Sequence, residues 1–291
     1  MTARRGVRGW LGLFGRGMAM GIAEVVPGVS GGTIAFITGI YFELVKTLAG
    51  IGPASVGLLV RRGPAEFWRE LNLSFLSVLV LGMLLAIVSF ARVIGYLLES
   101  FPTVVWGFFF GLIIVSVIQI GRGRPLRDLL LFGLLGCAGG FALNSLDPLQ
   151  AHEVLWVYFV GGVIAISAWM LPAISGSFML LVLGLYESVV QALNTLQWPV
   201  LVSLSLGCVA GMLVFSRLLA WLMANRREPV LALLTGFMAG SLIRLWPWAH
   251  GGSVLGPDGY ALATGQDPMV IATCLAVVAG GASLWLLSRL E

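Results

Sequence analysis

Two clusters rich in proline, glycine and serine interrupt long apolar stretches, and they contain most of the residues that could do chemistry. The first cluster comprises Pro27, Gly28, Ser30, Gly31, Gly32 and Thr33, and the second comprises Ser175, Gly176 and Ser177 after Pro172. A helix broken inside a membrane exposes backbone N–H and C=O groups, which is tolerated only where protein or a water-filled cavity satisfies them. Serine at such a break is a good N-cap, and the amides of the helix start that follows attract anions such as phosphate or carboxylate. We therefore predict that these residues line an anion-binding site.

Charged side chains within apolar segments are the second group of candidates, because a charge inside a bilayer is costly and is usually functional. Glu24 lies just before the first cluster and could bind or release a coupling proton or cation. An ion pair of Glu24 with Arg16 or Lys46 that only fixes the fold is the alternative. Arg92 and Arg217 each offer a planar, forked donor set to an anionic headgroup, and snorkelling to the nearest interface is the alternative for both.

The composition excludes a soluble protein. Of the 291 residues, 59% are hydrophobic and only 10% are charged, whereas a soluble domain carries about a quarter charged residues. The mean hydropathy is +1.00. The basic residues lie in short loops between apolar runs, so the net charge of +4 indicates positive-inside bias and not nucleic-acid binding. The three cysteines lie in apolar runs without metal-ligand spacing, and we expect neither a metal nor another cofactor.

Apolar windows of about 18 to 20 residues, long enough to cross a membrane, predict six spans. These spans cover residues 73–98, 103–121, 129–146, 199–223, 229–246 and 269–288. Two further stretches, 9–49 and 154–196, each contain two apolar legs that flank one of the clusters described above. We predict that both of these stretches are broken helices.

The two broken stretches, and the spans that follow them, resemble each other in sequence. The positions Pro27, Ser30, Gly31, Gly39 and Tyr41 align without a gap with Pro172, Ser175, Gly176, Gly184 and Tyr186. Three further matches follow downstream in the same order, and one of them pairs Arg92 with Arg217. We therefore expect an internal duplication with halves at residues 1–146 and 147–291.

The loop charges orient these halves in the membrane. Arginines mark the loops that we expect to be cytoplasmic, so the first broken element enters and leaves on the cytoplasmic side and the second on the outer side. Three full spans follow each broken element, which makes the repeats inverted. The predicted fold is an all-α integral membrane protein with an inverted-topology duplication. Each half is a broken or re-entrant helical hairpin followed by three transmembrane helices, and both termini are cytoplasmic.

The breaks resemble a known bacterial family. The segment from Glu24 to Tyr41 (E-V-V-P-G-V-S-G-G-T-I-A-F-I-T-G-I-Y), and L-P-A-I-S-G-S-F with the following G-L-Y between Leu171 and Tyr186, are similar to the polyprenyl-phosphate transporters, the undecaprenyl phosphate translocases. Ala173 departs from the family pattern P-G-I-S-G-S. The resemblance implies a carrier, and not an enzyme, that returns undecaprenyl phosphate from the outer to the cytoplasmic leaflet of the inner membrane. The lipid carrier is thereby recycled for cell-wall synthesis, and the partners are the polyprenyl phosphate lipid and the bilayer.

Other interpretations of the same residues are open at this stage. The proline and glycine clusters could merely kink packed helices. An intramembrane polyprenyl diphosphate phosphatase also has inverted repeats and a P-G-x-S break, but such enzymes carry an arginine where this chain has Gly31 or Gly176, and a paired-glutamate helix that this sequence lacks. A secondary transporter of a soluble anion is the third alternative.

Overall fold

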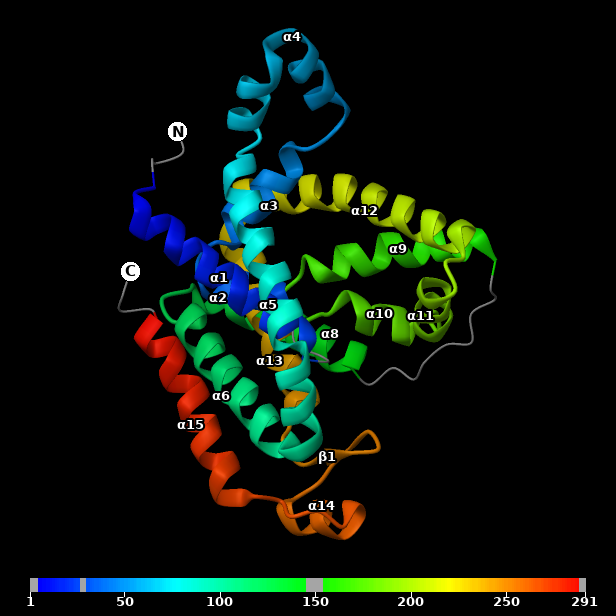
Figure 1. Ribbon diagram of the computed structural model, residues 1–291. Helices are drawn as coiled ribbons and strands as arrows, with labels where there is room; N and C mark the ends of the chain where they lie inside the picture. The colour runs from blue at the N-terminus through cyan, green and yellow to red at the C-terminus, as the bar shows by residue number, and fades with distance from the viewer. Residues whose placement is uncertain (1–4, 27–29, 145–153, 288–291) are drawn as a thin grey trace. The chain divides into compact units, whose positions relative to one another are not determined.

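The computed structural model describes residues 5–26, 30–144 and 154–287, and nearly all of them are helical (Figure 1). The helices are α1 (Val7–Val25), α2 (Gly31–Ile37), α3 (Tyr41–Gly50), α4 (Pro53–Glu70), α5 (Leu73–Ser100), α6 (Pro102–Gly121), α7 (Leu126–Asp128), a π-helix (Leu129–Gly133), α8 (Leu134–Asn144), α9 (Leu155–Trp169), α10 (Gly176–Val182), α11 (Tyr186–Asn194), α12 (Trp198–Asn225), α13 (Arg227–Ser241), a 3-10 helix (Leu242–Leu245), α14 (Pro257–Thr264) and α15 (Val270–Leu287). A short antiparallel hairpin pairs β1 (Ala249–His250) with β2 (Ser253–Val254).

The predicted spans all appear as helices. Within the described residues, five helical runs are long and apolar enough to cross a membrane, and two bent helix pairs pass the same test when each pair is taken as one span. The sixth predicted span corresponds to α15, of which Val270–Trp285 is apolar but shorter. The prediction of an all-α integral membrane protein is confirmed.

The chain forms two compact units. Unit 1 comprises Met1–Ser89 and Leu146–Asn225, and unit 2 comprises Phe90–Ser145 and Arg226–Glu291. Each unit therefore takes one segment from each of the predicted halves. These compact units differ from the halves 1–146 and 147–291 that we predicted from sequence similarity. The internal duplication stays a prediction.

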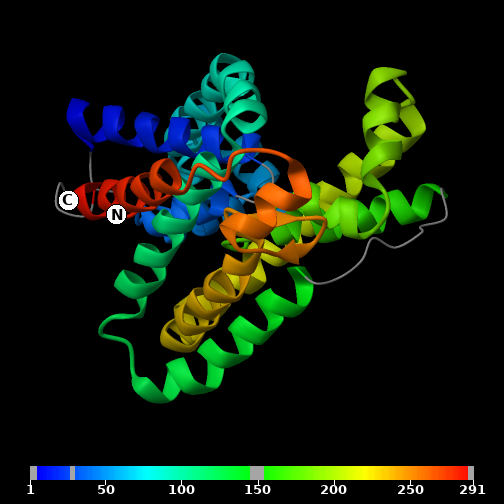
Figure 2. The same cartoon turned by 90° about the horizontal axis from the view of Figure 1, so that it is seen from below.

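Glycines set the closest helix contacts within each unit. In unit 1, α9 and α12 lie side by side (Figure 1), and a Cβ on Gly162 would come within 2.3 Å of the Leu204 carbonyl oxygen. In unit 2, α6 packs along α15, and α8 packs along α13 (Figure 2). A Cβ on Gly136 of α8 would lie 2.0 Å from the carbonyl oxygen of Leu233. Small residues of this kind let helix backbones approach closely in a membrane, where no hydrophobic force drives helices together.

Each broken stretch has a second bend that the sequence analysis missed. After the predicted break, the chain bends by 120° between α2 and α3, and by 113° between α10 and α11. Gly39 and Gly184 stand at these bends with φ of +75° and +70°, in the left-handed region that glycine adopts without a steric penalty. Each stretch is thus a long helix, a break, and a sharply bent pair of short helices.

Two loops also contain structure that the hydropathy pattern did not predict. The basic loop before α5 contains α4, which is kinked at Gly63 with φ of +82°. The loop between α13 and α15 contains the β1–β2 hairpin and α14.

A pair of substitutions on α8 tests the glycine contact. Gly136→Ala places a methyl group against the Leu233 carbonyl, and we expect it to cost about 1–3 kcal/mol of stability through overpacking. Gly139→Ala, three residues further on, meets no atom closer than 3.8 Å and should leave the melting temperature unchanged or slightly raised. Thermal unfolding in detergent measures both, and equal melting temperatures would contradict this description of the contact.

Candidate functional site

The two breaks lie in the same unit and bond directly to each other. The hydroxyl of Thr33 accepts a hydrogen bond from the backbone N–H of Ala173 at 2.7 Å. The hydroxyl of Tyr41 donates to the carbonyl oxygen of Met170 at 2.7 Å. Thr33 and Tyr41 are both buried. Residues more than 120 positions apart in the chain therefore satisfy two backbone groups of the second break.

Glu24 connects both breaks through one carboxylate oxygen. Its Oε1 accepts from the backbone N–H of Gly31 at 2.7 Å and from the indole Nε1 of Trp169 at 2.7 Å. Gly31 begins α2, and Trp169 ends α9 just before the second break. A carboxylate next to the start of a helix is a favourable arrangement, because the first amides there carry partial positive charge. Glu24 thus has one polar partner at each break, the Gly31 amide at the first and the Trp169 indole beside the second.

The first break already uses the amides that we predicted to attract an anion. Ser30 is the N-cap of α2, as its position in the cluster predicted, and its hydroxyl accepts from the Gly32 N–H at 3.1 Å. The Gly31 amide bonds to Glu24, so a side chain of the protein itself occupies this anion position. Pro27 and Gly28, which we predicted to belong to the site, lie outside the described residues.

The second break is bonded differently. Ser175 stands at the N-cap position of α10, but its hydroxyl lies 2.7 Å from the hydroxyl of Ser177 and does not cap the helix. Among the described residues, the amides of Gly176 and Ser177 have no hydrogen-bond acceptor. Ala173 has φ of +67°, in the left-handed region, where the related family pattern has glycine. The backbone at this break thus adopts a conformation that glycine reaches more easily than alanine does.

Among the described residues, the hollow where the two breaks meet is small. Gly32, Tyr41, Trp169 and Met170, together with apolar side chains of α3, surround a hollow that is too small for a water molecule. A Cβ on Gly32 would lie 2.7 Å from the Trp169 carbonyl oxygen, so even this position tolerates no side chain. This hollow, as the described residues form it, has no room for a headgroup.

The two candidate arginines have different surroundings. Arg217 of α12 donates from Nη2 to the Ile51 carbonyl and from Nη1 to the Leu213 carbonyl, both at 2.9 Å. A positive side chain at the Ile51 carbonyl also stabilises the C-terminal end of α3. Arg92 belongs to unit 2, is exposed on α5, and has no polar partner within the part of the chain that is described. The structure therefore brings Arg217, but not Arg92, into the unit that contains the breaks.

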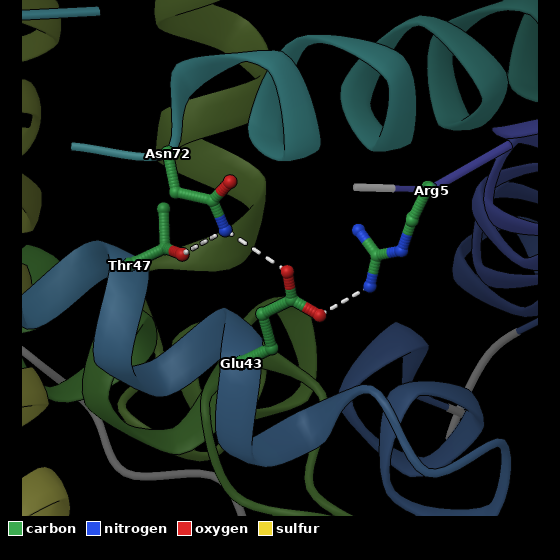
Figure 3. Close-up of polar contacts among 4 residues, drawn as sticks. All are labelled: Arg5, Glu43, Thr47 and Asn72. Carbon is green, nitrogen blue, oxygen red and sulfur yellow. Dashed lines mark hydrogen bonds and ion pairs between the residues drawn. The ribbon is translucent and has the colours of Figure 1, made fainter. Parts of the chain in front are cut away.

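One polar network was not predicted at all. Arg5 forms an ion pair with Glu43 of α3, whose other carboxylate oxygen accepts from the Asn72 side chain at 2.9 Å (Figure 3). The Asn72 amide also lies 3.4 Å from the Thr47 hydroxyl, and the Arg5 guanidinium lies 5.2 Å from the centre of the Phe75 ring. This network ties the segment before α1 to the bent helix α3 and to the start of α5. The arginine-rich N-terminus was the only sequence signal for it, because the partners lie far apart in the chain.

These features define the class of protein. Broken helices with irregular backbone buried in a helical membrane protein are typical of secondary transporters, in which such breaks form the substrate site. Comparison with known proteins gives the family: the chain belongs to the undecaprenyl phosphate translocase-like (VCA0040-like) family, whose sequence profile matches residues 20–257. The family is one of transporters, which separates the chain from the phosphatases considered above.

Two relatives agree with this assignment. The polyprenyl-phosphate transporter of Vibrio cholerae is 42% identical over 82% of this chain and 78% of its own length. The polyprenyl-phosphate transporter of Staphylococcus aureus is 32% identical over 82% of this chain and 86% of its own length. No solved structure matches the chain.

The left-handed residue at the second break provides a test of its geometry. A non-glycine residue in this region costs about 1–2 kcal/mol, so Ala173→Gly should raise the melting temperature in detergent. Ala165→Gly, inside α9, should lower it, because glycine in a helix costs about 1 kcal/mol. A lower melting temperature for Ala173→Gly would mean that the backbone at this break is not left-handed.

Proposed function

We propose that the protein moves undecaprenyl phosphate from the outer to the cytoplasmic leaflet of the bacterial inner membrane. The observation that carries this proposal is the 42% identity to a polyprenyl-phosphate transporter over most of both chains. Transport in this direction recycles the lipid carrier of cell-wall precursors. The arginine-rich loops support a cytoplasmic position for both termini.

The two breaks are the proposed site for the phosphate. Backbone amides and hydroxyls at a break can hold an anion, while the isoprenoid tail stays in the hydrocarbon. At the second break the amides of Gly176 and Ser177 have no acceptor in the described part of the chain, and the Ser175 and Ser177 hydroxyls belong to the same turn. At the first break Ser30, Gly31, Gly32 and Thr33 would supply the equivalent groups once the contacts between the breaks open.

Glu24 is the proposed coupling group. Its carboxylate already holds the Gly31 amide, so a phosphate that approaches this amide meets a second negative charge. Two unit charges of like sign about 4 Å apart repel by about 4 kcal/mol at an effective dielectric constant of about 20. Protonation of Glu24 removes this repulsion and weakens its hold on Gly31. Binding of the phosphate and uptake of a proton would therefore favour each other.

The closed hollow between the breaks supports a mechanism of alternating exposure. The hydrogen bonds from the second break to Thr33 and Tyr41 would break before a headgroup enters. Arg92 and Arg217 are the proposed residues that meet the phosphate, one in each leaflet. Arginine has five N–H donors, and Arg217 uses two of them on backbone carbonyls, so three stay available.

Leaflet-resolved transport of several substrates by the purified protein tests the proposed function. Proteoliposomes should move fluorescent or chemically accessible undecaprenyl phosphate between leaflets faster than protein-free liposomes. They should neither release phosphate from undecaprenyl diphosphate nor accumulate soluble phosphate. Release of phosphate would support the phosphatase alternative, and uptake of soluble phosphate without lipid movement would support an anion transporter.

A neutral substitution of Glu24 tests its coupling role. Glu24→Gln keeps an acceptor for the Gly31 and Trp169 N–H groups but cannot exchange a proton, so the dependence of the transport rate on pH should flatten. The same substitution at Glu187, which is exposed on α11, is the control and should keep the wild-type profile. A wild-type profile in Glu24→Gln would assign Glu24 a purely structural role.

Alanine substitutions of Arg92 and Arg217 should differ in their effects on the transport rate and the melting temperature. Arg92→Ala should lower the transport rate about tenfold or more, the effect of losing a charge-assisted contact to phosphate, without changing the melting temperature. Arg217→Ala should lower both quantities, because it also removes the bond to the Ile51 carbonyl. Transport at the wild-type rate in both well-folded variants would exclude contact of these arginines with the phosphate.

A further inference from the structure

Unit 2 contains an open groove of about 440 Å³ that no part of the proposed mechanism uses. It is lined by the last turn of α6, by the π-helix and α8, and by α13, with Arg122 in the loop that follows α6. Pockets for small ligands usually occupy about 300–1,000 Å³, so the volume is large enough for part of a lipid.

The lining is suited to a hydrocarbon chain. Thr235 is a hydroxyl-bearing residue of the groove, and its hydroxyl donates to the Leu231 carbonyl at 2.6 Å within its own helix. The hydroxyl donor is therefore not available to a ligand. Leu129 and Cys137, which both line the groove, lie eight positions apart along the helix, and at about 1.5 Å per position this is about 12 Å. An elongated apolar groove of this length accommodates a chain and not a compact polar solute.

Arg122 adds a positive charge at the loop end of the groove. Arg124, two residues further on, is neutralised by Glu228 at 2.6 Å and also donates to the Ile120 carbonyl. Arg122 has no such partner among the residues that the structure describes, and its side chain is exposed. Arginine binds phosphate through parallel N–H donors, so the groove combines an apolar lining with a donor for an anionic headgroup.

Two glycines leave the groove open although helix packing does not require them. A Cβ on Gly133 would meet its nearest atom at 3.7 Å, and one on Gly121 at 3.9 Å, both ordinary contact distances. Gly236 is different, because its Cβ would lie 1.9 Å from the Gly133 carbonyl oxygen. The π-helix that ends at Gly133 is itself a rare element that often marks functional sites.

We propose that this groove is a second lipid site, which holds the isoprenoid units next to the headgroup of polyprenyl phosphate while Arg122 binds the phosphate. The identity of the lipid rests on the proposed function. The apolar lining and the arginine without an acidic partner among the described residues are observed in unit 2 itself. Because a phosphomonoester carries a charge of about −1.5 to −2 at neutral pH, it should bind Arg122 more strongly than a phosphodiester lipid such as phosphatidylglycerol. The loop with Arg122 is predicted to be cytoplasmic, which would make this the site that holds the lipid on the cytoplasmic side.

Photo-crosslinking with a polyprenyl phosphate that carries a diazirine near its headgroup tests this site. The full chain is reconstituted in lipid nanodiscs, irradiated, and digested, and the labelled peptides are identified by mass spectrometry. Labels should fall within residues 117–137 and 235–239, and excess undecaprenyl phosphate should suppress them while phosphatidylglycerol should not.

Matched variants distinguish the groove from general lipid contact. Gly133→Leu fills the groove, and Gly139→Leu places the same side chain on α8 outside it. Arg122→Ala removes the proposed phosphate contact, and Arg127→Ala removes another exposed arginine, which lies on the nearby helix α7. Labelling should fall about tenfold in the first member of each pair and stay unchanged in the second. Gly121→Leu repeats the groove-filling test from α6 if Gly133→Leu does not fold.

The outcomes separate this inference from the proposed function. Equal suppression of the labels by phosphatidylglycerol, or unchanged labelling in Gly133→Leu and Arg122→Ala, would contradict the proposal that the groove binds polyprenyl phosphate. If the wild-type protein transports undecaprenyl phosphate but the groove carries no label, the second lipid site is wrong and the proposed function is retained. If the groove is labelled specifically but the protein moves no lipid, the second lipid site is supported and the proposed function is wrong.

Discussion

Backbone N–H and C=O groups at membrane depth have no water to bond, and this constraint shapes unit 1 around its two helix breaks. The breaks meet it by bonding to each other: Ala173 donates to Thr33, and Met170 accepts from Tyr41. Both bonds satisfy backbone groups of the second break with side chains of the first broken stretch. The same bonds close the space between the breaks, so the arrangement that stabilises this conformation is also the one that a substrate would have to open.

Glu24 makes the two breaks unequal. It draws the Gly31 amide and the Trp169 indole to one carboxylate oxygen, whereas at the second break the amides of Gly176 and Ser177 have no acceptor among the described residues. In the proposed mechanism, the charge at the two breaks depends on the protonation of this one carboxylate. Such a site can couple the movement of an anion to the binding of that proton. The coupling depends on Glu24, which only the first broken stretch contains.

Local patterns in the sequence were sufficient for much of the fold. Apolar windows predicted the six long helices, and the position of Ser30 predicted its N-cap bond, because both depend on neighbouring residues. Contacts between distant residues were not predicted: Trp169 lies 145 positions from Glu24, and Asn72 lies 29 positions from Glu43. The bends at Gly39 and Gly184 were missed because a single glycine in an apolar run also serves helix packing. For the same reason, sequence alone did not distinguish a glycine that leaves a groove open from one that packs against a helix.

The central claim is that the interlocked breaks are the place where the lipid phosphate crosses the membrane. Leaflet-resolved movement of undecaprenyl phosphate in proteoliposomes tests it most directly, with wild-type protein compared with a Ser30→Ala/Ser175→Ala double variant whose folding is verified by its melting temperature. We expect the wild type to move the lipid and the folded double variant to lose this movement. Movement at the wild-type rate in the double variant would contradict the claim.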